Sequence, residues 1–204
     1  GIPLCRLEEG LKEINKTFKD IDAAIFTHDH SDHLNGIKAL SPKKMYALEG
    51  TLPSSLSNVI ELYKPFKIKD IEITPFKTSH DATNPCGYLL KGENESLVYL
   101  TDTGIVLDEI FDLVANPTYL IIESNHDLSM LMKSSRPLEL KRRIRGEHGH
   151  LSNEDSAFFS SSIVGDKTKE IYLAHLSEEC NTPTLALAAY ENIFKYKCVN
   201  LSKY

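Results

Sequence analysis

The sequence predicts a single α/β domain with a metal centre at the ends of its strands. Short apolar runs, typical of buried strands, alternate with segments of helical periodicity along the whole chain. His28, His30, Asp32 and His33 fall within six positions directly after the first such run. The chain has 204 residues, of which 41% are hydrophobic and 25% charged, which is the composition of one globular domain with a sizeable core.

The order of helices and strands follows from periodicity. The first element expected is an amphipathic helix, because apolar side chains recur at intervals of three and four residues: Leu4, Leu7, Leu11, Ile14 and Phe18. Apolar runs predict strands over residues 21–27, 71–76, 87–90, 97–101, 119–123 and 171–174. Helices are expected over residues 107–114, 137–144, 152–164 and 183–194. Ser152 and Asp155 form a capping-box pattern at the start of the third of these helices.

Part of the sheet is expected to be antiparallel. The runs that contain Tyr88 and Tyr99 are separated by Gly92-Glu93-Asn94, which is typical of a hairpin. The sequence shows no internal repeat and no low-complexity linker, so we expect one domain over residues 1–204.

Composition excludes several classes of protein. No apolar run approaches the roughly 18 residues of a membrane span. The net charge of −6 argues against a protein that coats nucleic acid without regard to sequence. The four cysteines are widely spaced, form no CxxC pair and follow no secretory leader, which predicts reduced thiols and a cytoplasmic location: Cys5, Cys86, Cys180 and Cys198.

The histidine-rich segment after the first strand predicts metal binding. Imidazole and carboxylate groups are ligands for Zn²⁺ and similar ions, and several must converge on a small volume. His28 and His30 lie two residues apart in an extended segment and therefore point the same way. Asp32 and His33 continue into the first turn of a helix and can address a second ion. The alternative is a solvated polar loop whose histidines are incidental.

Three more donors follow apolar strands: His80, Asp102 and His175. Ligands displayed at strand ends on a rigid sheet are a common way to build such a centre. Each residue alone is equally typical of an ordinary loop, as a hydrogen-bonded histidine or as a turn-forming aspartate before Thr-Gly. Together with the first segment, they supply the ligands that two metal sites need.

This pattern resembles the metallo-β-lactamase superfamily. The resemblance rests on the HxHxDH segment, a later histidine, an aspartate in a Thr-Asp-Thr-Gly context and a final histidine after an apolar strand. Further segments are similar to the WalJ (YycJ) branch of bacterial cytosolic proteins with nuclease-like features: Ser79–Ala82, Pro85–Tyr88, Glu123–Asp127, Leu140–Ile144, Gly149–Asn153 and Leu173–Ser177. The resemblance covers nearly the whole chain.

The resemblance implies a four-layer αβ/βα sandwich with two divalent metal ions, Zn²⁺ or Mn²⁺, at one edge of its two sheets. It assigns His28, His30 and His80 to the first ion. It assigns Asp32, His33 and His175 to the second ion, and Asp102 to a bridging position. Members of the superfamily also place a strand pair and an Asp-x-Gly turn before the first helix. Here Gly1 leads almost directly into that helix, so we expect an N-terminally truncated domain that lacks this pair.

The ligand set predicts a binuclear metal-dependent hydrolase. We expect a phosphodiesterase or exonuclease in which a metal-bridging hydroxide, oriented by Asp32, attacks phosphorus. His126, His148 and His150 are candidates for protonating the leaving group, because only histidine titrates unperturbed near neutral pH. His150 is preferred because it precedes a predicted helix start, where backbone N–H groups favour phosphate.

Each of these three histidines could instead have a supporting role. His150 can simply brace the helix that follows it. His148 and His150 form an HxH pair that could bind metal, and His126 can orient a ligand as a neighbour of the metal site.

A basic segment predicts a nucleic-acid substrate, most simply DNA. Residues 133–145 hold six basic side chains against Glu139 alone. Four of them are candidate phosphate-binding residues: Lys141, Arg142, Arg143 and Arg145. Few aromatic residues accompany them, so contact with the backbone and not with the bases is expected. The alternative is a solvated helix face.

Two other functions compete with the nuclease. A thioesterase or lactonase similar to glyoxalase II would share every metal ligand but would not need the basic segment. A non-catalytic regulatory binding protein would not need all seven ligands. The sequence leaves open the choice of DNA or RNA, the polarity of cleavage and the oligomeric state.

Overall fold

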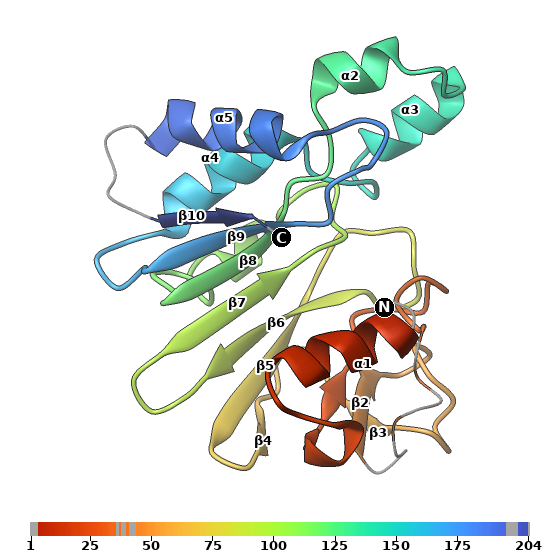
Figure 1. The fold of residues 1–204 in the computed structure, drawn as a ribbon, viewed down its shortest axis with the longest axis vertical. Coiled ribbons are helices and arrows are strands. Elements are labelled where there is room, and N and C mark those ends of the chain that lie inside the picture. The colour runs from red at the N-terminus through yellow and green to blue at the C-terminus, as the bar shows by residue number, and fades with distance from the viewer. Residues whose placement is uncertain (1–3, 36, 38–39, 41–43, 195–199, 204) are drawn as a thin grey trace.

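The computed structural model describes residues 4–35, 37, 40, 44–194 and 200–203, whose strands form two sheets (Figure 1). The smaller sheet is parallel, in the order β1-β2-β3, with bounds Ala24–Ile25, Met45–Leu48 and Asn58–Ile60. The larger sheet has the order β10-β9-β8-β7-β6-β5-β4. Its bounds in chain order are Phe66–Ile68, Ile71–Lys77, Cys86–Lys91, Ser96–Leu100, Tyr119–Glu123, Glu170–Ala174 and Asn200–Lys203.

The seven-stranded sheet is mixed, and its parallel part sets the position of the site. Strands β4 to β7 pair antiparallel, with Tyr88 opposite Tyr99 in the predicted hairpin. Strands β7 to β10 pair parallel, so their carboxyl ends reach the same edge. The register places Leu100 beside Ile122, and Glu123 beside Ala174. The residues that follow these strands therefore lie side by side.

The core is divided between the two faces of the large sheet. Helices α4 (Asn153–Ile163) and α5 (Pro183–Phe194) cover one face (Figure 1). Adjacent residues of β6 belong to different cores, because side chains alternate along a strand. Leu89 packs in the cluster beneath α4 and α5, whereas Tyr88 packs in the cluster that contains Leu48 and Ile60 of the small sheet. The two sheets thus face each other, as the α/β sandwich prediction requires.

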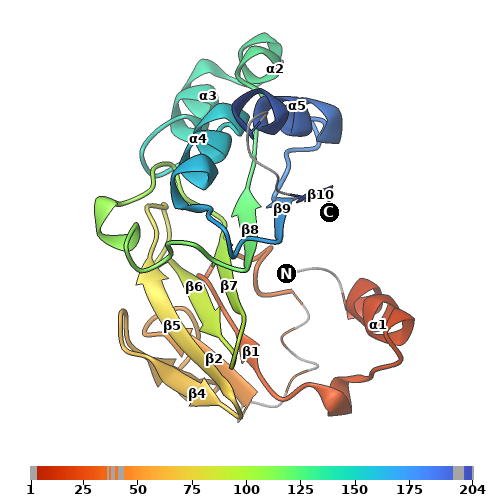
Figure 2. The ribbon, with the colours of Figure 1, turned by 90° about the vertical axis from the view of Figure 1, so that its left-hand side faces the viewer.

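Helix α1 (Leu4–Glu13) forms the first part of the helix that the periodicity predicted up to Phe18, and none of its residues is buried. Phe18 lies instead in a separate 3₁₀ turn, Phe18–Asp20. Figure 2 shows α1 standing apart from the two sheets. Leu7 overhangs a hollow of about 420 Å³ that is also lined by Leu97 and Tyr99 of β7. The prediction that a strand pair precedes this helix in the complete domain stays a prediction.

Other predicted elements differ in extent from those in the structure. Of the strand expected over residues 21–27, only β1 forms a strand. Of the helix expected over residues 107–114, the structure has a single 3₁₀ turn, Asp108–Ile110. In the part of the chain that the structure describes, one α-helix and four strands were not predicted: α2 (Leu128–Lys133), β2, β3, β4 and β10. All five are six residues or shorter, too short to show a clear period.

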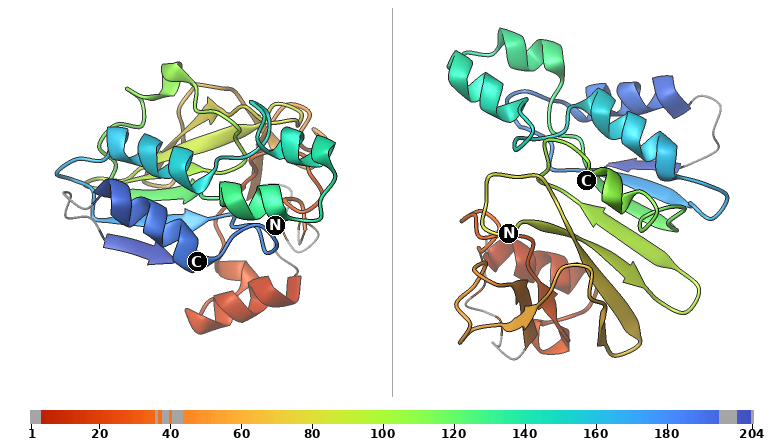
Figure 3. Two further views of the ribbon diagram at one scale, coloured as in Figure 1. Left: turned by 90° about the horizontal axis from the view of Figure 1, so that it is seen from above. Right: turned by 180° about the vertical axis from the view of Figure 1, so that it is seen from behind.

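Helices α3, α4 and α5 agree closely with prediction. Helix α3 (Leu138–Ile144) lies within the predicted range, and α4 begins after Ser152 as its N-cap. The Asp155 N–H donates to Ser152 Oγ at 3.1 Å, as in a capping box. Helices α2 and α3 form a hairpin that stands out from the body of the molecule (Figure 3).

The described residues bear on two predictions from composition, which concern membrane spans and the state of the cysteines. Among those residues, no helix is long and apolar enough to cross a membrane. Cys5, Cys86 and Cys180 carry free thiols, and Cys198 lies outside the described residues.

The turn after β7 has no room for a side chain at Gly104. A Cβ there would lie 2.1 Å from Gly146 O and 2.5 Å from the carbonyl of Glu147. Both contacts are backbone, so neither can rotate away. We expect Gly104→Ala to destabilise the protein by about 2 kcal/mol, measured as the midpoint of urea unfolding.

Gly10→Ala is the matched control for this substitution. A Cβ at Gly10 meets nothing within 4 Å, and the residue lies inside α1. Alanine there should stabilise the helix by up to about 1 kcal/mol. Equal effects of the two substitutions would contradict the close approach at Gly104.

Candidate metal centre

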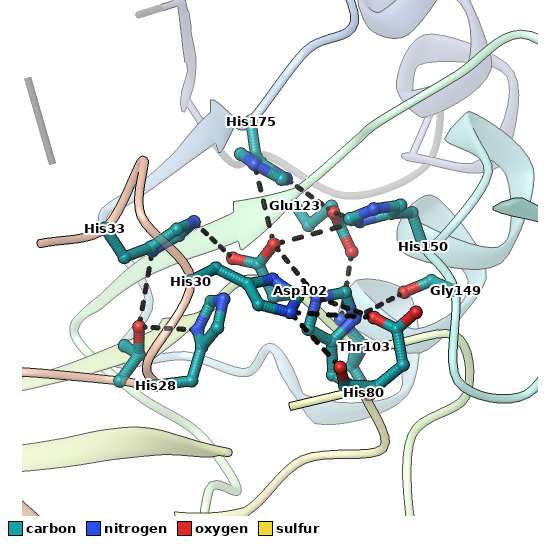
Figure 4. A network of polar contacts seen from close by, with 12 residues as sticks. His28, His30, His33, His80, Asp102, Thr103, Glu123, Gly149, His150 and His175 are labelled. Carbon is teal, nitrogen blue, oxygen red and sulfur yellow. Dashed lines mark hydrogen bonds and ion pairs between the residues drawn. The ribbon is translucent and has the colours of Figure 1, made fainter. Parts of the chain in front are cut away.

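Five chain segments bring their polar residues to one edge of the two sheets (Figure 4). The residues from Thr27 to His33 follow β1, and His80 follows β5. Asp102 follows β7 and His175 follows β9, while Glu123 is the last residue of β8. The Cys86 N–H donates to Thr27 O at 2.9 Å and joins the first segment to the large sheet.

The backbone turns sharply at two of these residues. Asp102 has a φ of 58° and His175 a φ of 56°, in the left-handed region that side chains other than glycine seldom adopt. Each residue lies just beyond the end of a parallel strand. Such conformations cost energy and are concentrated at functional sites, where surrounding contacts maintain them.

The seven predicted ligands lie together in three overlapping groups. Within each group the donor atoms are no more than 4.8 Å apart: His28, His30 and His80; His28, His33 and Asp102; Asp32, His33 and His175. Asp102 lies between the two predicted ion sites. Its Oδ2 is 3.5 Å from His33 Nε2, and its Oδ1 is 3.5 Å from His175 Nε2 and 3.8 Å from His80 Nε2.

The donor atoms fit a cation. His28 Nε2 and Asp102 Oδ2 are buried and have no hydrogen-bond partner among the described residues. A buried polar atom without a partner costs free energy, which a bound ion would recover. Burial, and then the neighbouring His33, lower the pKa of His28 to about 4, so its ring is neutral at pH 7 and offers a lone pair. Mixed imidazole and carboxylate donors suit Zn²⁺ and Mn²⁺ alike.

Hydrogen bonds select the ring nitrogen that each histidine presents. His30 Nε2 donates to Asp81 O at 3.1 Å, which leaves Nδ1 free for a metal. His80 Nδ1 donates to Gly149 O at 3.1 Å, which leaves Nε2. Such outer contacts orient metal-binding histidines and increase their affinity.

Glu123 also belongs to the candidate centre, although the metal-binding motifs did not indicate it. Its buried Oε1 accepts hydrogen bonds from Nδ1 of His150 and of His175, each at 2.7 Å. Its Oε2 accepts the backbone N–H groups of Thr103 at 3.2 Å and Leu151 at 3.1 Å. A signal for it was present, because Glu123 ends an apolar strand just as Asp102 and His175 follow theirs.

The charges around Glu123 are strongly coupled. Burial raises the pKa of Glu123, but the hydrogen bonds from His150 and His175 outweigh burial and hold it well below its ordinary value. Burial lowers the pKa of His175, but the hydrogen bond to Glu123 and the charge of Asp102 raise it to about 9. Glu123 therefore stays ionised and keeps its two partners in one orientation.

The three candidate proton donors lie in different surroundings. His150 and His148 line a hollow of about 300 Å³ beside the centre, and His148 Nδ1 lies 3.0 Å from Ser79 Oγ. His126 is buried, lines none of the hollows around the centre, and neither ring nitrogen has a hydrogen-bond partner among the described residues.

Two of the four predicted phosphate-binding side chains, those of Lys141 and Arg143, bind oxygen acceptors within the protein. Lys141 Nζ donates to Met132 O at 2.8 Å and Ser134 O at 2.7 Å, at the end of α2. Arg143 lines the hollow and is paired with Asp81. Arg142 and Arg145 are exposed on the α2–α3 hairpin.

Comparison with known proteins decides the family. Residues 6–175 match the model of the β-lactamase superfamily domain. The chain belongs to the β-lactamase superfamily. Within this superfamily it is 40% identical, over 86% of its length and 71% of the relative, to exodeoxyribonuclease WalJ of Streptococcus pneumoniae serotype 2 (strain D39 / NCTC 7466). It is 33% identical to exodeoxyribonuclease YycJ of Bacillus anthracis, over 91% of the chain and 75% of the relative.

A solved structure supports the superfamily fold. The metallo-β-lactamase fold protein YhfI of Bacillus subtilis superposes with a TM-score of 0.73 at 15% identity. The superposition covers 100% of this chain and 82% of YhfI. The predicted metallo-β-lactamase-like fold is therefore confirmed.

Glu123→Gln tests whether the buried carboxylate orients the centre. Glutamine has one acceptor oxygen and cannot accept all four hydrogen bonds, so we expect metal affinity to fall about 10- to 100-fold. Metal titration of the purified protein measures this change. Glu147→Gln, which removes a charge from an exposed residue in the loop before His150, is the control. Unchanged affinity in Glu123→Gln would contradict the assigned role.

His126 should make the metal-free protein sensitive to acid. Burial lowers its pKa from 6.5 to about 4, so between these pH values the unfolded chain binds a proton that the folded chain does not. Stability therefore falls as the pH drops through this window. We expect His126→Leu to lose less thermal stability than the unmodified chain between pH 7 and pH 5. An equal loss in both proteins would show that His126 does not contribute.

Proposed function

We propose that this protein is a binuclear metal-dependent phosphodiesterase, acting as an exonuclease on DNA. The observation that carries the proposal is the seven-residue cluster around Asp102, which opens beside a hollow lined by Arg136 and Arg143. The names of the two curated relatives support the choice of DNA and of exonuclease activity. The widely spaced free thiols support a cytoplasmic location.

The ligands are proposed to hold two divalent ions, Zn²⁺ or Mn²⁺. His28, His30 and His80 would hold one, and Asp32, His33 and His175 the other, with Asp102 between them. When bound, such a pair of ions supplies a nucleophilic water at neutral pH and stabilises charge on a phosphodiester. Asp32 is the most exposed of the carboxylates in this set, with 69% of its side chain accessible, and would orient the attacking water.

His150 is the favoured proton donor to the leaving oxygen. Its Nδ1 is engaged by Glu123, so Nε2 is the ring nitrogen that can serve a substrate in the hollow. His148 also lines the hollow but stands on an exposed part of the loop. His126 has no route to a substrate through the buried position it occupies, which favours a structural role for it.

The α2–α3 hairpin supports an anionic polymer as substrate. Arg136 and Arg143 line the hollow, while Arg142 and Arg145 extend the positive surface along the hairpin. A strand of DNA whose end enters the hollow would keep its backbone against these side chains. A thioesterase or lactonase of the same superfamily would share the ligands, but the arginines favour the nuclease.

A substrate panel tests this function. End-labelled single- and double-stranded DNA, RNA and a thioester are incubated with protein loaded with Zn²⁺ or Mn²⁺. We expect metal-dependent release of nucleotides from linear DNA, weakened by added salt because phosphate contacts release counterions. Hydrolysis of the thioester without cleavage of DNA would overturn the proposal.

His30→Ala and Asp102→Ala test the assignment of the centre. We expect both to lose metal, and the rate of hydrolysis to fall at least about a thousandfold, because His30→Ala removes a ligand of one ion site and Asp102→Ala removes the carboxylate between the two sites. Asp108→Ala, at an exposed carboxylate in the 3₁₀ turn, is the control and should keep both metal and rate. Full turnover in either ligand variant would contradict the assignment.

A further inference from the structure

Asp81 lies at the rim of the metal centre, between an arginine and two candidate metal ligands. Its Oδ2 accepts Arg143 Nε at 2.6 Å and also contacts Arg143 Nη2. Its Oδ1 lies 3.5 Å from His80 Nε2 and 4.0 Å from His30 Nε2. One carboxylate thus faces an arginine of helix α3 with one oxygen and two candidate metal ligands with the other.

Asp81 lies outside the ligand groups themselves. Among the described residues, the groups whose donor atoms converge within 4.8 Å do not include it. Its carboxylate is instead the wall that two hollows share. Asp81, His80 and His148 line both the hollow of about 300 Å³ next to Arg143 and a second one of about 350 Å³ next to His30.

This placement is the one that a substrate phosphate needs. A phosphodiester has two non-bridging oxygens, and an arginine beside a metal centre would bind one while the other faces the ions. If the Asp81 carboxylate stayed between the arginine and the ions, its negative charge would repel the substrate phosphate. The charge must therefore give way when an anion enters.

The pair between Asp81 and Arg143 is suited to such an exchange. The side chain of Arg143 is 63% exposed and that of Asp81 is 32% exposed. Ion pairs of this kind contribute little to stability, because water and salt screen them. The pair keeps Arg143 in position. Breaking the pair costs little free energy, so the arginine can change its partner.

We propose that Asp81 holds Arg143 in place of the substrate phosphate, and that the incoming phosphate takes this arginine over from Asp81. The proposal rests on the proposed function, because it assigns the phosphate to this centre. Asp81 is then a specificity-determining residue. A neutral ester has no charge with which to displace Asp81 from Arg143, so the carboxylate stays at the entrance. A phosphodiester or a terminal phosphate displaces the carboxylate and binds the arginine.

A double-mutant cycle with inorganic phosphate as the probe tests the exchange. Binding of phosphate to the metal-loaded protein is measured by calorimetric titration at about 0.15 M salt for Asp81→Asn, Arg143→Gln and the double variant. We expect Asp81→Asn to bind phosphate about two- to fivefold more tightly, since the competing carboxylate is gone. We expect Arg143→Gln to bind about tenfold more weakly.

The double variant carries the decisive comparison. If Asp81 acts through Arg143, Asp81→Asn has no effect on phosphate binding when Arg143 is already replaced. Glu147→Gln removes a charge from an exposed residue nearby and controls for the general effect of net charge. In assays of DNA cleavage, Asp81→Asn should also lower KM and the inhibition constant of phosphate by similar factors.

Two results would overturn the proposal. Loss of metal from Asp81→Asn, measured by elemental analysis, would show that Asp81 is itself a ligand. An equal gain in phosphate affinity with and without Arg143 would show a general charge effect. Failure of the proposed function is distinguishable from both, because the protein would then cleave no DNA while the phosphate titrations still decide the role of Asp81.

Discussion

The arrangement of the metal centre depends on one buried carboxylate, that of Glu123. A charged group removed from water is stable only if hydrogen bonds replace its hydration. Glu123 has four such bonds, from two histidine rings and two backbone N–H groups. These donors come from the turn after β7, from the loop before α4 and from the end of β9. Loss of order in any one of them would leave the charge unsatisfied, so the carboxylate holds all three in register.

The same requirement explains why strained backbone persists at the centre. Asp102 and His175 both adopt left-handed backbone conformations, which are unfavourable for residues other than glycine. The contacts of Glu123 with His175 and with Thr103 secure the two turns on either side. The imidazole rings of His33 and His80 lie close to that of His28, with ring centroids 4.1 and 5.1 Å from its own. Burial above all lowers the pKa of these rings, which favours the neutral state that binds metal.

Charge is distributed unevenly over the fold, and the net value conceals this. The chain carries −6 overall, yet the α2–α3 hairpin beside the centre is strongly basic. Several of these basic side chains are already engaged, Lys141 with helix-end carbonyls and Arg136 with Glu179 at 2.8 Å. Engagement holds long side chains in defined places and lowers the entropy lost when an anion binds. Exposed partners such as Glu179 and Asp81 can be exchanged, whereas buried Glu123 cannot.

The sequence by itself determined the fold and the candidate ligands, because both leave strong local patterns. His28, His30, Asp32 and His33 lie close together in the chain, and apolar runs mark the strands after which His80, Asp102 and His175 stand. Short elements such as β2 and β3 were missed, since three or four residues carry no clear period. Only the tertiary structure decided which nitrogen each histidine presents, and that Glu123 and Asp81 belong to the centre. These depend on contacts between residues up to 69 positions apart, such as His80 with Gly149, and distance in space at that separation leaves no local trace in a sequence.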